Sequence, residues 1–183
     1  AVLMSAAEVW LLRAEAALRG YTKENPRTCY EYGVSTSFTQ WDCAGASEYL
    51  ESDKTPADYK DVVSGGKVGK DMKALITISP KWEEDADIET KLEKIITQKW
   101  LAMFPEGCEA WAEQRRTGYP RLFPVRFNNS RNSSIDTEIM VRRLNFPGSL
   151  VTENKAQYDA LVEALGGADN GGTRLWWDTG RNF

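Results

Sequence analysis

Apolar positions recur at helical spacing in the first twenty residues of the chain. Residues 6–19, AAEVWLLRAEAALR, are apolar on most sides, and one narrow strip holds Glu8, Leu12, Glu15 and Arg19. Ser5 followed three residues later by Glu8 is a capping box, and Gly20 is a C-terminal stop. Five alanines in the segment let neighbouring helices approach closely. The pattern predicts a helix that lies inside a helical stack.

Similar signals predict four further helices before residue 120. Asn25 and Pro26 begin a helix that runs to about Gln40. Asp87 caps the longest helix, whose last turn is apolar nearly all round and is expected to be deeply buried. The four predicted segments are residues 26–40, residues 46–50, residues 88–104, and a short helix that resumes after a break at Pro105 and Gly107 and runs to about Arg116.

The rest of the chain is predicted to be largely irregular. Residues 51–80 carry several glycines and prolines, and only residues 74–78 have the pattern of a short strand. Beyond Pro120 no clear period is present, and NNSRNSS and GGADNGGT are polar loops. The expected fold is mainly α, a helical scaffold element with an irregular loop-rich region and little β. We expect a single domain over residues 1–183.

Composition excludes several kinds of chemistry. The chain has 183 residues, a net charge of −4 and no histidine. The missing histidine excludes Ser-His-Asp triads, Cys-His pairs and histidine-ligated zinc. The negative charge gives no reason to expect nucleic acid as a partner, and no apolar run is long enough to span a bilayer. No cofactor or metal is expected.

Three cysteines, Cys29, Cys43 and Cys108, lack the C-x-x-C spacing of a zinc cluster. A disulfide between Cys29 and Cys43 is one interpretation. Free and mostly buried thiols are favoured, because unpaired cysteine is commonly buried.

Charged segments each allow a functional and a structural interpretation. Seven arginines between Arg115 and Arg143 suit a phosphate patch, but pairing with the glutamates of the long helices is favoured. The acids at positions 83, 84, 85 and 87 suit a glycosidase, but a cap matched to the helix dipole is favoured. Asp169 and Asn170 among glycines suit a calcium site, but a glycine-rich turn is favoured.

Seven tryptophans fall into two groups. Trp10, Trp100 and Trp111 lie in apolar helical patterns and are expected in the core. The other four are the candidate ligand-binding residues: Trp41, Trp82, Trp176 and Trp177. Exposed aromatic rings stack on sugars because one face of a pyranose is apolar, although any one of these rings is more often a core or interface anchor.

The segment PEGCEAWAEQRRTGYPRLFP, residues 105–124, first suggests a site because acids, arginines and aromatic residues are mixed in it. Spacing favours a structural corner. Trp111 can stack with Arg115, and Glu113 can pair with Arg116. Lys99 is expected to pair with a glutamate just beyond its helix, Glu106 or Glu109.

Several segments together resemble the C-terminal part of the SusD/RagB family of outer-membrane lipoproteins. They are MSAAEVWLLRAEAALRGY, KLEKIITQKWLAMFPEGCEAWAEQRRTGYPRLFPV, RRLNFP and GGADNGGTRLWWD. The resemblance spans residues 4–178, and residues 91–124 are its most specific part. The family's signal peptide, lipid-bearing cysteine and earlier helices are missing from this sequence, so the N-terminal part of the same protein is an expected partner.

The resemblance implies a TPR-like helical scaffold and a non-enzymatic role. Family members bind glycans or other nutrients at the surface of the outer membrane and deliver them to a SusC-like TonB-dependent transporter. The expected partners are therefore that transporter and an oligosaccharide or other nutrient. Two alternatives stay open: a glycoside hydrolase that uses paired carboxylates, and a scaffold that docks the transporter without binding ligand.

Overall fold

The computed structural model describes residues 3–62, 71–124, 128, 130, 135, 136 and 139–183. The chain divides into two compact units, one comprising Ala1–Leu122 with Asn182 and the other Phe123–Arg181 with Phe183. Helix is the regular structure of the described residues, and one isolated antiparallel bridge joins Tyr59 to Met72. The fold is mainly α, as predicted. The expectation of a single domain over residues 1–183 stays a prediction.

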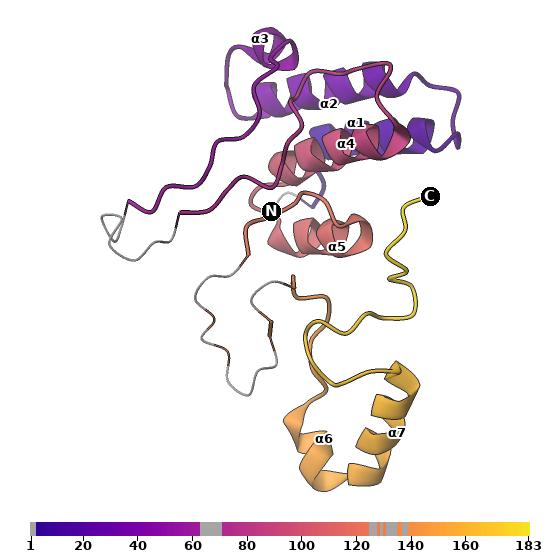
Figure 1. Cartoon of the computed structure of the whole chain (residues 1–183). Helices are drawn as coiled ribbons and strands as arrows, with labels where there is room; N and C mark the ends of the chain where they lie inside the picture. Colours follow the sequence, from indigo (N-terminus) through magenta and orange to yellow (C-terminus); the bar gives the residue numbers. More distant parts are fainter. Residues whose placement is uncertain (1–2, 63–70, 125–127, 129, 131–134, 137–138) are drawn as a thin grey trace. The chain divides into compact units, whose positions relative to one another are not determined.

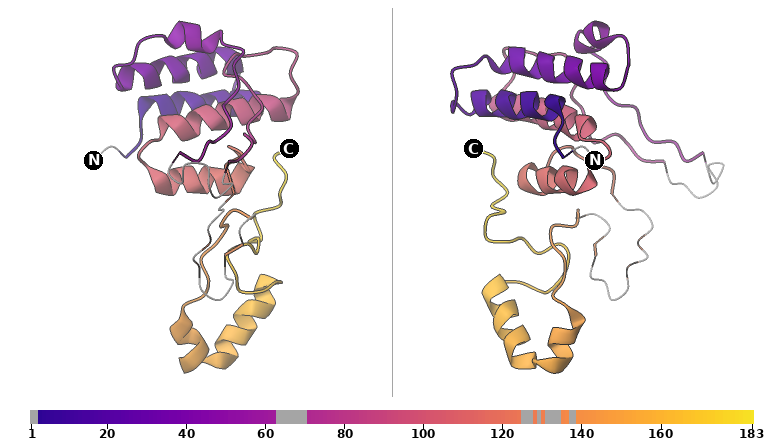
Figure 2. Two further views of the ribbon diagram at one scale, coloured as in Figure 1. Left: turned by 60° about the vertical axis from the view of Figure 1, so that its left-hand side comes forward. Right: turned by 180° about the vertical axis from the view of Figure 1, so that it is seen from behind.

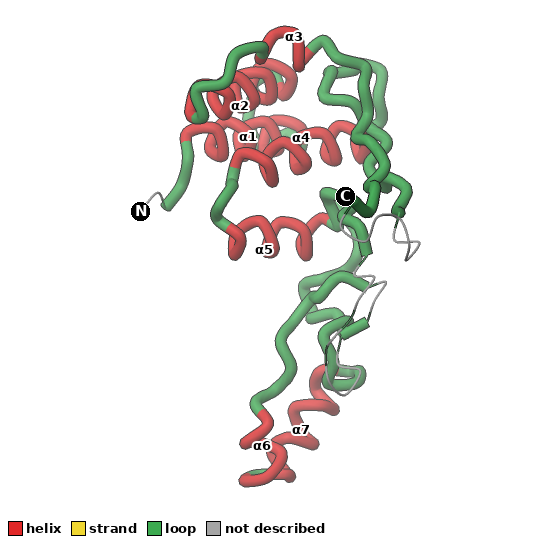
Figure 3. The backbone as a smooth tube through the Cα atoms, turned by 90° about the vertical axis from the view of Figure 1, so that its left-hand side faces the viewer, coloured by secondary structure: helices red, strands yellow, loops and turns green. Residues whose placement is uncertain are grey.

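The first unit is built on three helices that lie side by side (Figures 1 and 3). They are α1 (Ala6–Leu18), α2 (Pro26–Gln40) and α4 (Ile88–Ala102). Each begins at a side chain that accepts a backbone N–H three residues on: Ser5, Asn25 and Asp87. These caps confirm the predicted helix starts, because each satisfies a donor that the helix itself leaves unpaired.

The core lies where these three helices meet. Leu11 of α1 is fully buried, and a Cβ on Gly33 of α2 would lie 2.6 Å from its Cγ. Tyr30 of α2 is also fully buried and donates its hydroxyl to the Pro80 carbonyl over 2.6 Å. The face of α4 adds the remaining large aliphatic side chains, Leu92, Ile95 and Ile96.

The connection after α2 contains α3 (Ala46–Leu50), as predicted, but residues 74–78 do not form the predicted strand. The carboxylate of Asp58 accepts the Ala74 N–H over 2.9 Å, so a side chain takes a backbone donor that a strand would offer to a partner strand. Just before this segment, the Asp71 carboxylate accepts the Asp61 N–H over 3.0 Å.

Residues 105–124 form the predicted corner around α5 (Gly107–Thr117). Lys99 is buried and reaches Glu113 at 3.1 Å and Glu109 at 3.8 Å. The Arg115 guanidinium lies 3.8 Å from the Trp111 ring centroid. The expectation for Lys99 was thus correct for Glu109, while the shorter contact, to Glu113, was not foreseen.

The end of α4 corrects the prediction of deep burial. Met103 is 3% exposed, but Leu101 is 48% exposed and Phe104 is 68% exposed. Trp100 and Trp111 are half-buried, as is Trp10 in α1, although all three were expected in the core. An apolar helix end predicts that something covers it, but in this chain only one side of the end meets α1 and α2.

A charge network that links the buried Glu15 and Glu113 through the partly exposed Arg116 joins α1 to α5. Arg116 places two guanidinium nitrogens 2.7 Å from the two carboxylate oxygens of Glu15, and Arg19 donates to the same carboxylate over 2.8 Å. Arg116 also pairs with Glu113 at 2.7 Å, as predicted. Burial alone would raise the pKa of Glu15, but the hydrogen bonds and charges of the two arginines outweigh burial and lower it.

The second unit contains two helices that were not predicted, α6 (Gly148–Glu153) and α7 (Lys155–Leu165), which form a V (Figure 2). Sequence signals for α7 were present. Asn154 caps it by accepting the Gln157 N–H over 3.1 Å, and Gly166 ends it at a φ of 72°. Tyr158, Leu161, Val162 and Leu165 also recur at helical spacing and form its half-buried face, so the expectation of irregular structure here was wrong.

Candidate functional site

The four candidate tryptophans lie in three different environments. Trp82 is 7% exposed and packs on Tyr30, with ring centroids 5.3 Å apart. Its polar sequence neighbours suggested an exposed ring, but the chain turns at Pro80 and directs the indole into the core. Trp82 as placed therefore offers no ring face to a ligand, which corrects the expectation of exposure.

Trp41 lies at the end of α2 and is 47% exposed. Its ring lies 5.9 Å from the ring of Phe104, at an interplanar angle of 52°. Both rings border two neighbouring hollows, of about 370 and 580 Å³. The larger hollow has mostly carbon walls, which come from Trp41, Trp100, Leu101, Phe104, Pro105 and Ala110.

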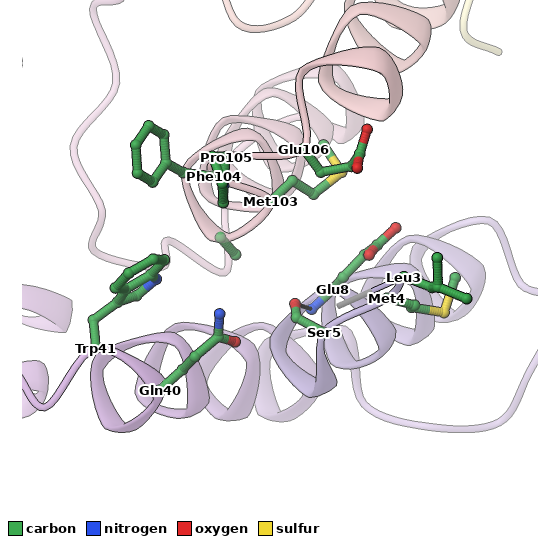
Figure 4. A pocket seen from close by; sticks show the side chains of 11 residues that line it. Leu3, Met4, Ser5, Glu8, Gln40, Trp41, Met103, Phe104, Pro105 and Glu106 are labelled. Atoms are coloured by element: carbon green, nitrogen blue, oxygen red, sulfur yellow. Dashed lines mark hydrogen bonds between the residues drawn. The ribbon is translucent and has the colours of Figure 1, made fainter. Parts of the chain in front are cut away.

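The smaller hollow contains a carboxylate that the sequence did not single out. Figure 4 shows Trp41 and Phe104 on one side, Leu3 and Met4 on the other, and Glu8 reaching from α1 toward the α4–α5 turn. Glu8 is 5% exposed, yet its side chain has no hydrogen bond or ion pair with the described residues. Only half of the predicted capping box forms, since Ser5 accepts the Glu8 N–H but Glu8 does not return a bond.

Trp176 is the most exposed large apolar residue of the described chain, at 92%. Asp178, two residues after Trp176, fixes the turn that carries this ring. Asp178 is buried, ion-pairs with Arg142 at 2.6 Å and with Arg174, and donates its N–H to the Leu175 carbonyl over 2.9 Å. Adjacent Trp177 is half-buried. Of the two consecutive tryptophans, Trp176 thus exposes its indole to solvent on a turn fixed by ion pairs, whereas Trp177 is half-buried.

The glycine-rich turn before these tryptophans has a structural role, as favoured. The Asn170 side chain accepts the N–H groups of Gly172 and Thr173, each over 3.0 Å. Asp169 pairs with buried Arg143 at 2.6 Å and accepts the Phe146 N–H over 3.1 Å. Its oxygens are therefore already used, and among the described residues no group of three or more acids or cysteines could hold a metal ion.

Ion pairs explain most of the arginine run. Arg116 and Arg121 pair with glutamates of the helices, Arg121 with Glu93 at 3.2 Å. Arg142 and Arg143 pair instead with aspartates of the second unit. The favoured interpretation is confirmed for Arg116 and Arg121, whereas Arg142 and Arg143 are ion-paired with partners that were not predicted. Positions 126 and 131 lie outside the described residues.

The acids before α4 also behave as the favoured interpretation predicted. Asp87 caps α4, and hydrogen bonds from Thr90 lower the pKa of its carboxyl. Glu83 pairs with buried Lys94 at 3.0 Å. Two other acids share a cavity, since Glu8 and Glu106 both line the smaller hollow.

The three cysteines are free thiols. Cys29 is buried, and burial raises its pKa, but Cys43 and Cys108 are exposed, so the expectation of mostly buried thiols holds for one of three. Within the described ranges, no helix combines the length and apolar character that crossing a bilayer requires.

Comparisons with known proteins show what this chain is similar to. Residues 1–178 match the family model described as SusD-like, Susd and RagB outer membrane lipoprotein. A susd homolog from Bacteroides vulgatus is 57% identical over the whole chain, with a TM-score of 0.83. A chitin-binding SusD homolog from Flavobacterium johnsoniae is 45% identical over 98% of the chain, also with a TM-score of 0.83.

The chain spans only about a third of these relatives, covering 36% of the Bacteroides vulgatus protein and 37% of the Flavobacterium johnsoniae protein. A search of curated proteins gave no match. The solved relatives share the TPR-like helical fold of SusD proteins. The chain belongs to the SusD/RagB family of outer-membrane lipoproteins.

Proposed function

We propose that this chain is the C-terminal part of a surface-exposed lipoprotein that binds oligosaccharides without cleaving them and delivers them to a SusC-like TonB-dependent transporter. Membership of the SusD/RagB family and the chitin-binding relative at 45% identity support this role. The observation that carries ligand binding in this chain is the 92% exposure of Trp176 on a turn fixed by the buried Asp178.

The chemistry of this turn suits a sugar. An indole face offers a flat apolar surface to the axial C–H groups of a pyranose, and the turn that carries this indole is fixed before a ligand arrives. Asp178 also ion-pairs with Arg174, whose guanidinium is half-exposed and can donate to sugar hydroxyls. The ligand class we propose is a glycan with exposed apolar sugar faces, with chito-oligosaccharides as the first candidates.

Isothermal titration with chito-oligosaccharides, malto-oligosaccharides and unrelated peptides tests this role. We expect one oligosaccharide class to bind, and Trp176→Ala to weaken its binding by roughly tenfold or more, as for an aromatic anchor of a binding site. Tyr21→Ala is the control, because Tyr21 is 78% exposed in the other unit. Binding that Trp176→Ala leaves unchanged would move the site away from this turn.

The two alternatives predict different results. A hydrolase would release reducing ends from a bound oligosaccharide, and Glu8→Gln or Glu106→Gln would abolish the release, since these acids share one hollow. A docking scaffold would co-purify with the transporter yet bind no member of the titration panel. Binding without release of reducing ends supports the proposal over both.

A further inference from the structure

The exposed apolar side chains at the end of α4 form one continuous surface. We call it the corner patch and define it by Trp41, Trp100, Leu101, Phe104 and Pro105, which all line the larger hollow. Trp41, Phe104 and Pro105 also line the smaller one, where Leu3 and Met4 are 91% and 56% exposed. Water-facing apolar residues gathered in this way mark a surface that another molecule covers.

Glu8 adds a chemical requirement for whatever covers the patch. Glu8 is 5% exposed as a whole residue, its carboxylate opens onto the smaller hollow beside apolar walls, and the described residues give it no donor. A molecule that fills this hollow removes the carboxylate from its remaining water, which is strongly unfavourable unless that molecule supplies a partner. Glu106 on the far wall adds a second negative charge. The occupant should therefore carry an apolar face and one basic side chain that reaches Glu8.

A protein segment fits these walls better than a sugar does. The larger hollow offers an oligosaccharide few hydrogen-bonding side chains, since aromatic and aliphatic residues line most of it. The Trp41 ring is partly covered by Phe104, so it is not an open stacking surface. A longer SusD-type chain can supply such a protein segment, because nearly two thirds of the Bacteroides vulgatus relative lies outside the region that this chain matches.

We infer that the corner patch and Glu8 form the docking surface for the remaining part of the longer SusD-type chain, which contributes an apolar face and a lysine or arginine that pairs with Glu8. Trp41 is then an interface anchor and not a sugar-binding residue. The inference is independent of oligosaccharide binding at Trp176, because it concerns other residues in the other compact unit.

A chimera tests the inference in a whole protein. The 183-residue chain replaces the matching region of the Bacteroides vulgatus relative, and hydroxyl-radical footprinting compares oxidation in the chimera and in the chain alone. We expect Leu101, Phe104 and Met4 to be protected several-fold in the chimera. Leu75 is the matched internal control for Leu101, because the two leucines are 44% and 48% exposed in this chain. Equal oxidation of Leu101 and Phe104 in both proteins overturns the inference.

A two-part association assay covers the case of a chimera that does not fold. The remaining part of the relative is purified separately and titrated with this chain. Leu101→Ser, Phe104→Ser and Glu8→Gln should each weaken association by about tenfold or more, while Leu75→Ser leaves it unchanged. No association, or association that the three patch variants do not weaken, overturns the inference. So does protection of Phe104 in the isolated chain by an oligosaccharide, which would make the patch a sugar site.

Discussion

Two buried glutamates of the first unit differ in how well their charge is satisfied. Glu15 receives hydrogen bonds from both Arg116 and Arg19, and its pKa is lowered despite burial. Glu93 is also buried, but its partner Arg121 is half-exposed at 3.2 Å and its Oε1 has no hydrogen bond. Burial therefore dominates and raises the pKa of Glu93. The two residues should respond to neutralisation in opposite ways.

Glu15→Gln should lower the free energy of unfolding at pH 7 by about 1–2 kcal/mol, because the substitution removes the charged bidentate contact with Arg116, which is 39% exposed and keeps its pair with Glu113. Thermal denaturation followed by circular dichroism measures this as a fall in Tm of several degrees. Because the folded pKa of Glu15 lies below its ordinary 4.5, its contribution is present above that value and is lost as the pH falls through the folded pKa. The difference between variant and parent should shrink in acid.

Glu93→Gln should leave the stability at pH 7 unchanged or raise it. The folded pKa of Glu93 lies above its ordinary 4.5, so its favourable contribution is present below 4.5 and is lost as the pH rises through the folded pKa. Glutamine removes a partly unsatisfied buried charge, and Arg121 can turn toward water. The same melting experiment checks it, and a Tm that falls as far as it does for Glu15→Gln would contradict it.

At the residue scale, the sequence predicted contacts between residues a few positions apart but not contacts between residues far apart in the chain. The Ser5, Asn25 and Asp87 caps could be predicted because each bond spans three residues. Trp82 could not be placed, because its burial depends on Tyr30, a residue more than fifty positions away that only the packing of α2 brings close. Glu8 was misjudged for a similar reason, since it faces a hollow that α1 shares with the α4–α5 turn.

At the scale of elements, sequence signals predicted where helices lie better than they predicted which surfaces those helices pack against. The start of α2 was predicted to the residue, because Pro26 and its cap fix the first turn, and its end was predicted at about Gln40. The exposed end of α4 was not predicted, because an apolar pattern shows that a surface is covered without showing which molecule covers it. In α7 both the caps and an apolar helical spacing were present in the sequence and were missed.

Gly33→Ala tests how closely α1 and α2 pack. A Cβ at this position would lie 2.6 Å from Leu11 Cγ and 3.4 Å from the Ala7 carbonyl oxygen. Overpacking costs about 1–3 kcal/mol, and alanine regains about 1 kcal/mol of helix propensity. We expect a net loss of about 1 kcal/mol, which lowers Tm by roughly 3 °C for a chain of this size.

Gly107→Ala is the matched control for that experiment. Gly107 is the first residue of α5, and a Cβ there would meet no atom within 4 Å. This variant should therefore melt at the parent temperature or slightly above it. If Gly33→Ala also melted at or above the parent temperature, Leu11 would have to move without loss, and the close approach of α1 and α2 would contribute nothing to specifying the stack.

At the scale of the whole molecule, the carboxyl groups together set the response to acid. Among the described residues, a hydrogen-bonded or ion-paired environment lowers the pKa of five carboxyls: Glu15, Glu24, Asp58, Asp71 and Asp87. Burial raises the pKa of Glu93 instead. Below the ordinary values of 4.5 for glutamate and 3.8 for aspartate, the unfolded chain therefore binds more protons than the folded chain.

Tm should consequently stay nearly level from neutral pH down to about pH 5, and then fall as the pH drops further. Glu93 acts in the other direction, so protonating it adds stability between its folded pKa and 4.5. Melting curves at half-unit pH steps distinguish these contributions. Glu15→Gln should make the acid decline shallower, because one lowered carboxyl is gone, and Glu93→Gln should remove any rise before the decline. A Tm that climbs steadily from pH 6 to pH 3 would mean that desolvated carboxyls outweigh the paired ones in this chain.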